Sequence, residues 1–240
     1  HVELVRPLAD AVVALDRVDF EVGAAEVHAF LGENGAGKST LLKILSGAQM
    51  PDAGTIEFDG QEVSFKSPHD AQNRGIVTIY QEFTLAPDMT VAENIFIGRE
   101  PGSRLFISRA QLEEQGKAFS KRIGLDRDPR ALVRDLSVAE QQMVEIARAL
   151  SMKSRLIVMD EPTSALSRSE VDKLFEIIRR LKGEGISTIF VTHRLEEVFE
   201  ICDRYTVLRD GRLAGSGNVP GATLDHLRSR RSGCGLCCPR

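Results

Sequence analysis

The chain has 240 residues, of which 42% are hydrophobic and 28% charged, and its formal net charge is −4. These values are typical of a globular protein with an ordinary hydrophobic core, which needs no disulfide or metal to hold it together. The negative charge provides no global positive field for nucleic acid or anionic lipid, and no apolar run approaches the ~18 residues of a membrane-spanning helix.

Apolar runs rich in β-forming residues recur along the chain, at 12–22, 26–31, 54–60, 76–80, 156–160, 187–192 and 205–211. Between the later runs the apolar residues have helical spacing, as in 170–181, where Ser167 and Glu170 form an S-x-x-E capping box at the start. Strands that alternate with helices predict βαβ units and a largely parallel sheet, and therefore an α/β fold.

The middle of the chain has a different pattern. Between about 85 and 150 the strand signals stop, and helices are predicted to start at Thr90, Ser108 and Ser137. Beyond 218 the periodicity is lost. We divide the chain into an α/β core, an inserted helical subdomain and a flexible C-terminal tail, at 1–84 with 151–218, at 85–150 and at 219–240.

A glycine-rich stretch, GENGAGKST, follows the run at 26–31 and precedes a predicted helix. It matches G-x-x-x-x-G-K-[ST], a loop whose backbone N–H groups converge on phosphate oxygens. Gly35 and Gly37 allow the backbone angles required, and the helix dipole favours an anion. Lys38 supplies a charge for the β- and γ-phosphates, and Ser39 a hydroxyl for Mg²⁺. The candidate nucleotide-binding residues are Gly32, Glu33, Asn34, Gly35, Ala36, Gly37, Lys38, Ser39 and Thr40.

Two carboxylates follow the apolar run at 156–160. Asp160 ends this predicted strand, which would place its carboxylate beside the Mg²⁺ of such a loop. Glu161 is a candidate general base that polarises the attacking water. Alone, these acids would be a solvated strand end, and it is the glycine-rich loop that favours the catalytic interpretation.

Three polar residues complete the candidate site. Gln81 and His193 follow the runs at 76–80 and 187–192, so they are predicted at the carboxyl ends of parallel strands, where α/β folds bind ligands. Ser137 caps a helix, and a helix N-terminus with a serine hydroxyl is also an anion site. Taken singly, Gln81 would be a surface amide and His193 a helix cap. Their placement relative to the loop favours a functional role.

The motifs occur in the order glycine-rich loop, Gln81, Leu136–Ser137, Asp160–Glu161, SALS at 164–167 and His193. With this order and spacing, residues 10–217 resemble an ABC-transporter ATPase domain. The segments 80–100, 136–150 and 192–211 further resemble the first ATPase half of bacterial monosaccharide importers of the ribose, xylose and galactoside type. The resemblance implies a P-loop NTPase (ABC ATPase) core with an antiparallel β region and an inserted helical subdomain.

The resemblance also implies the cofactors ATP and Mg²⁺. Lys38, Ser39 and Gln81 would hold the nucleotide and the metal, with Asp160 in the outer shell of the metal. Glu161 would be the catalytic base.

His193 would steady the γ-phosphate and the attacking water, and Gln81 would complete the catalytic set with Glu161. Ser137 would contact the nucleotide of a second ATPase domain, because such domains pair head to tail.

The implied partners are therefore a second ATPase domain and the transmembrane permease. Gln81 and the loop after it, with Phe83 and Leu85, would couple to cytoplasmic loops of the permease, although these two side chains could equally pack beneath the loop. A substrate-binding protein would act indirectly, and no nucleic acid is expected. The chain would lie at the cytoplasmic face of a bacterial membrane and meet it only through the permease.

Several features depart from the family pattern. Val138, Ala139 and Glu140 stand where the signature L-S-G-G-Q has its last three residues, and Glu140 adds a negative charge near the phosphate unless it turns back into a capping box. Residues 1–19 contain no aromatic ring to stack on adenine, a contact worth ~1–3 kcal/mol. Ser167 replaces an acidic residue.

Members of this importer group carry two fused ATPase halves, and this chain matches one. Four residues near the end could be considered for a zinc site, but without a second ligand pair at suitable spacing a tail is favoured. They are His226, Cys234, Cys237 and Cys238. Cys202 is predicted to be a small buried hydrophobe, and the cysteine pattern suits a reducing compartment.

We predict an ATP-hydrolysing subunit that powers import of a monosaccharide. One alternative is a non-transport ABC ATPase of DNA repair or translation, against which stand the absence of sustained heptads and of a basic stripe between Ser39 and Leu136. The other is a weakly hydrolysing regulatory half, which the altered signature suggests and the intact Glu161 and His193 oppose. The sequence does not identify the sugar.

Overall fold

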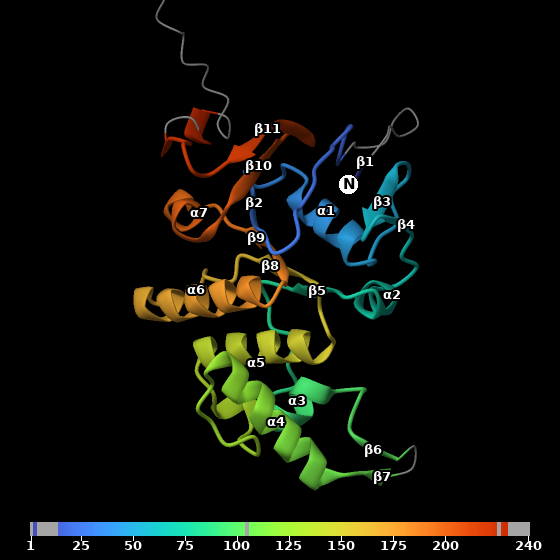
Figure 1. Cartoon of the computed structure of the whole chain (residues 1–240), viewed down its shortest axis with the longest axis vertical. Helices are drawn as coiled ribbons and strands as arrows, with labels where there is room; N and C mark the ends of the chain where they lie inside the picture. The colour runs from blue at the N-terminus through green and yellow to red at the C-terminus, as the bar shows by residue number, and fades with distance from the viewer. Residues whose placement is uncertain (1, 4–13, 104–105, 225–226, 230–240) are drawn as a thin grey trace, which may run out of the picture.

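The structure, a computed structural model, describes residues 2–3, 14–103, 106–224 and 227–229. At its centre lies a six-stranded sheet with the order β11-β10-β2-β9-β8-β5 (Figure 1). Its strands are β2 (Val27–Gly32), β5 (Ile76–Ile79), β8 (Leu156–Asp160), β9 (Ser187–Val191), β10 (Arg204–Arg209) and β11 (Arg212–Asn218). All neighbours are parallel except β10 and β11. The predicted, largely parallel sheet is confirmed.

Helices cover both faces of this sheet, because its strands are apolar at successive positions. On one face, Phe30 and Val158 belong to a buried cluster with the apolar residues of α1 (Lys38–Leu45). On the other face, Leu31 and Ile157 belong to a larger cluster with residues of α6 (Arg168–Gly183) and α7 (Leu195–Ile201). The loops at the carboxyl edge of the sheet are thus held on a rigid base.

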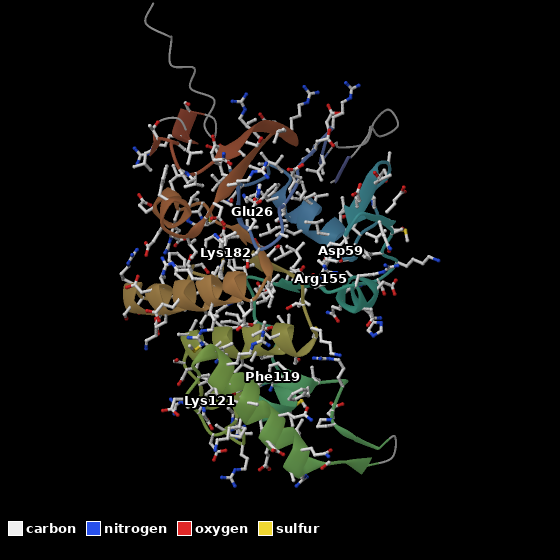
Figure 2. All side chains as sticks on the ribbon, in the orientation of Figure 1. Glu26, Asp59, Phe119, Lys121, Arg155 and Lys182 are labelled. Carbon is white, nitrogen blue, oxygen red and sulfur yellow. The ribbon has the colours of Figure 1, made fainter. Side chains whose placement is uncertain are left out.

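A small antiparallel sheet lies beside the main one, as the resemblance implied. It has the order β1-β3-β4 and is followed by a short helix; the elements are β1 (Val2–Glu3), β3 (Thr55–Phe58), β4 (Gln61–Val63) and α2 (Pro68–Asn73). Arg155, which precedes β8, forms an ion pair with Asp59 in the turn between β3 and β4 (Figure 2). The Arg155 guanidinium also lies 5.8 Å from the ring centroid of Phe58. These contacts join the two sheets.

The run at 12–22 does not form a strand in its described part, 14–22, where only Phe20 makes a β-bridge. Arg17 has a φ of 51°, which interrupts an extended backbone. The N–H of Asp16 donates to the carbonyl of Gly211 at 2.7 Å instead of to a neighbouring strand. The apolar pattern of this run reflects burial, because Val18 and Phe20 belong to the same cluster as α1.

Three helices form one end of the molecule (Figure 1) and pack against one another. They are α3 (Val91–Phe96), α4 (Arg109–Ile123) and α5 (Val138–Ser151), with the 3-10 turn η1 (Val133–Asp135) before α5. The predicted starts are confirmed, since the side chains of Thr90, Ser108 and Ser137 each accept a backbone N–H three residues on. The expectation that this region has no strands is wrong in one detail, because it holds a two-stranded pair too short to leave a periodic signal, β6 (Gly102–Ser103) and β7 (Phe106–Ile107).

The segment predicted as a tail begins with packed residues, since Val219 and Leu227 are buried in the larger cluster. Cys202 is buried as predicted, and burial raises the pKa of its thiol. The remaining residues considered for zinc lie outside the described part of the chain: His226, Cys234, Cys237 and Cys238. In the described ranges, no helix combines the length and the apolar character that crossing a bilayer requires.

Candidate nucleotide-binding site

The glycine-rich loop connects β2 to α1 and closes around the Lys38 side chain. The Lys38 ammonium donates to the carbonyls of Gly32 and Glu33, at 2.8 and 2.9 Å, and the residue is only 9% exposed. Gly35 and Gly37 have φ values of 82° and 97°, in the region that glycine favours. The loop therefore holds the Lys38 ammonium group at the start of α1.

The first turn of α1 adds to this preference for an anion. It contains no acidic residue, so nothing opposes the positive end of the helix dipole. Ser39 is exposed and Thr40 partly exposed, while Ala36 within the loop is buried. A phosphate group placed here would meet backbone N–H groups, a hydroxyl and the Lys38 charge together.

Asp160, the last residue of β8, lies close enough to this loop to interact with Lys38. Burial raises the pKa of the Asp160 carboxyl, and the neighbouring Glu161 charge raises it further, whereas the Lys38 charge lowers it. Because burial and the Glu161 charge disfavour the ionised form of the Asp160 carboxyl, a cation bound beside it would stabilise that form. Its oxygen and the Ser39 hydroxyl are hard donors of the kind Mg²⁺ takes when it also binds phosphates, so these residues fit the metal.

Glu161 and His193 meet at the ends of the adjacent strands β8 and β9. The Oε1 of Glu161 lies 3.2 Å from the Nδ1 of His193. Glu161 has a φ of 46°, a conformation that costs a non-glycine residue about 1–3 kcal/mol and is concentrated at functional sites. Its N–H donates to the carbonyl of Val191 at 3.0 Å, which fixes the turn.

The loop that carries His193 is held by a buried acid of α7. The Thr192 hydroxyl donates to Glu197 at 2.7 Å and accepts the backbone N–H of Arg194 at 3.0 Å. Glu197 is 4% exposed. His193 itself stays exposed, so its imidazole can reach a ligand outside the sheet.

Gln81 follows β5, which is the neighbour of β8, and its side chain is exposed. The order β2-β9-β8-β5 means that four adjacent strands deliver the loop, His193, the two carboxylates and Gln81 to the same edge of the sheet. The structure thus places every predicted site residue except Ser137 at this one edge of the sheet.

Ser137 caps the N-terminus of α5 and lines a different cavity, of about 560 Å³, between α5 and α6. Glu140 turns back toward it, accepting the Ser137 N–H at 2.8 Å, while the Ser137 hydroxyl accepts the Glu140 N–H at 3.3 Å. The Arg127 guanidinium donates to Glu140 at 2.5 Å, and this contact lowers the pKa of the Glu140 carboxyl. The extra charge in the altered signature is therefore paired.

Two contacts of the hairpin between β10 and β11, one of them with the loop, were not foreseen in the sequence. The carbonyl of Ala36 accepts the N–H of Gly211, and Arg212 pairs with Asp16 at 2.7 Å. An Asp-Gly pair between strands is a hairpin signal, but nothing in it specifies what the hairpin touches. The same N-terminal segment places Leu15, an aliphatic side chain, next to Gly37. Of residues 1–19, where the family pattern has an aromatic ring for adenine, 4–13 lie outside the described residues.

Comparison with known proteins agrees with this geometry. A family model described as ABC transporter matches residues 15–164. The ribose import ATP-binding protein RbsA 2 of Streptomyces coelicolor is 52% identical over 223 residues, which are 93% of this chain and 43% of that protein. The ribose import ATP-binding protein RbsA 1 of Rubrobacter xylanophilus is 57% identical over 204 residues, 85% of this chain and 41% of that protein. The chain spans less than half the length of these relatives.

Solved structures confirm the predicted fold class. An ATP-binding cassette of an ABC transporter in its ADP conformation matches with a TM-score of 0.80 at 27% identity, over 95% of this chain and 92% of the other. A dimeric, post-hydrolysis cassette bound to ADP and phosphate matches with a TM-score of 0.75 at 25% identity, over 91% and 96%. The chain therefore belongs to the ABC transporter family, and within it resembles the ATP-binding proteins of ribose importers.

Proposed function

We propose that this chain binds and hydrolyses ATP to power import of a monosaccharide through a partner permease. The observation that carries the proposal is the shared edge of the sheet, where the phosphate-binding loop, Asp160 and the contact between Glu161 and His193 come together. The names of the relatives support the sugar as the cargo.

The residues would divide the chemistry as follows. The loop N–H groups and Lys38 bind the β- and γ-phosphates. Glu161 takes a proton from a water molecule while the oxygen of that water bonds to the γ-phosphorus. The bond from that phosphorus to the oxygen of ADP breaks. His193 holds a γ-phosphate oxygen. Mg²⁺, when bound near Ser39, Gln81 and Asp160, would neutralise charge on the phosphates.

Ser137 would serve the nucleotide of a second ATPase domain in a head-to-tail pair. Its support is that Ser137 lies apart from this chain's own loop, on a helix of the three-helix end. We assign this end, 85–150, as the helical subdomain and 1–84 with 151–218 as the core. The permease would contact Gln81 and the loop that follows, at the cytoplasmic face of the membrane.

The first test is calorimetry of ATP binding with and without Mg²⁺. Lys38→Ala should abolish detectable binding, whereas Lys43→Ala, an exposed lysine on the same helix, should bind like the wild type. Glu161→Gln should bind ATP normally and release phosphate at least about 10²-fold more slowly. Equal ATP affinity of the two lysine variants would refute the assignment of the glycine-rich loop as the phosphate-binding site.

Import itself is tested by co-expression with candidate permeases and uptake of labelled ribose, xylose or galactosides. Uptake that depends on Glu161 supports the importer. If the chain hydrolyses ATP normally but no permease gives uptake, the importer role is refuted and only the ATPase activity stands. If the wild type binds ATP but does not hydrolyse it beside a competent second ATPase half, the regulatory alternative is favoured.

A further inference from the structure

The segment after β5 crosses from the sheet to the three-helix end of the molecule, where a buried carboxylate holds it. Glu145, in the middle of α5, is 3% exposed. Its Oε1 accepts the backbone N–H and the hydroxyl of Thr84, at 2.8 and 3.0 Å. Arg148 donates to its Oε2 at 2.6 Å and also contacts the Thr84 hydroxyl.

A second buried side chain fixes the next residues. Asn94 of α3 is fully buried; its Oδ1 accepts the N–H of Ala86 at 2.8 Å, and its Nδ2 donates to the carbonyls of Ala86 and Thr90, both at 3.0 Å. The chain is thus anchored in the sheet up to Ile79 and on the helices from Thr84. Gln81 lies in the short span between the two anchors.

The anchor at Glu145 depends on its charge. A buried carboxylate is stable only when it is paired, and here one guanidinium and two donors of Thr84 pair it. Arg99 lies near Arg148, and burial together with the Arg148 charge lowers the pKa of the Arg99 guanidinium. In Glu145→Gln the amide oxygen would still accept from Thr84, but Arg148 would lose its carboxylate acceptor and lie beside Arg99 without a neighbouring anion.

We propose that Glu145 is a positioning residue that ties Gln81 to the helix that begins at Ser137. The inference rests on the proposed function, in which Gln81 and Ser137 contact two different nucleotides. Because one helix carries both Ser137 and the anchor of Thr84, a shift of α5 on engaging the facing nucleotide moves the Gln81 span as well. The two sites are then linked mechanically.

The existence of the anchor is tested by hydrogen exchange in the absence of nucleotide. Glu145→Gln should speed exchange of the Thr84 amide about tenfold or more, as expected when its hydrogen bond to a charged carboxylate is replaced by a weaker one to a neutral amide oxygen. Glu114→Gln, which neutralises an exposed acid on α4, should leave it unchanged. If Glu145→Gln is not folded, Thr84→Val, which removes the hydroxyl and its hydrogen bond to Glu145, replaces it in the double-mutant cycle described next.

Its action through Gln81 is tested by a double-mutant cycle on the Mg²⁺ concentration that half-saturates ATP binding. Glu145→Gln should raise this concentration about tenfold, within the range found when a residue supporting a metal site is lost. In the Gln81→Ala background the same substitution should add nothing. A purely structural residue would lower the melting temperature and leave the Mg²⁺ dependence intact.

The outcomes separate the two ideas. If Gln81→Ala leaves the Mg²⁺ dependence unchanged, the proposed role of Gln81 is wrong and the inference falls with it. If Gln81→Ala weakens it and Glu145→Gln adds its full effect on top, the proposed function stands and the positioning role of Glu145 is refuted. Unchanged exchange at Thr84 in Glu145→Gln also refutes it.

Discussion

Replacing Gly37 by alanine should destabilise the protein far more than the same change at Gly35, two residues earlier in the loop. Both glycines have positive φ, which costs an L-residue about 1–2 kcal/mol. They differ in their surroundings. A Cβ on Gly35 meets no atom within 4 Å, whereas one on Gly37 lies 2.5 Å from the carbonyl oxygen of Ala14 and 2.7 Å from the Leu15 side chain.

The contact of the Gly37 Cβ with the Ala14 carbonyl oxygen sets the magnitude of the difference. A Cβ at 2.5 Å from a backbone oxygen must push residues 14–15 away, and overpacking of this kind costs about 1–3 kcal/mol more. We therefore expect about 1–2 kcal/mol for Gly35→Ala and about 2–5 kcal/mol for Gly37→Ala, measured by urea unfolding without nucleotide. Equal losses for the two variants would refute the reasoning, because they would mean that residues 14–15 do not lie against the loop.

Three further outcomes are expected. Glu197→Ala, which frees the loop carrying His193, should lower turnover while ATP affinity is kept, and a hydrolysis rate like that of the wild type would contradict the loop's role. Arg127 lowers the pKa of Glu140 below its usual 4.5, so the pair stabilises the folded state above that pH, and this contribution disappears as pH falls through the lowered pKa. Between these two pH values Arg127→Gln should therefore lose less free energy of unfolding than the wild type. An unchanged dependence of stability on acid pH would argue against the pair. Asn94→Ala removes a fully buried amide with several partners and should cost about 2–4 kcal/mol in thermal unfolding, with a cost under about 1 kcal/mol contradicting the network.

Much of the candidate site could be predicted because its residues are attached to strand ends. Once 76–80, 156–160 and 187–192 are recognised as parallel strands, Gln81, the two carboxylates and His193 must share one edge of the sheet. The phosphate-binding loop is read from its own sequence, since its glycines and lysine act locally. The periodicity of the apolar residues and the order of the motifs were sufficient to predict these parts of the site.

What could not be predicted depends on tertiary contacts. The pairing of Arg127 with Glu140 joins a loop to a helix start, and no local pattern specifies it. The Glu145 anchor is similarly hidden, because an acid in an amphipathic helix is usually solvent-exposed. The run at 12–22 misled for a related reason: apolar residues that pack beneath α1 give the same alternation as a strand.

The position of the loop in the sheet has a consequence for synthesis of the chain on the ribosome. The loop is translated early, yet β2 lies between β9 and β10, and the turn at Gly211 completes the contact with Ala36. A nascent chain in which β9 and β10 have not yet been synthesised carries the GENGAGKST sequence without the neighbouring strands that position it. Nucleotide capture is therefore expected to begin only when most of the domain has left the exit tunnel, so that ATP cannot trap a half-made fold.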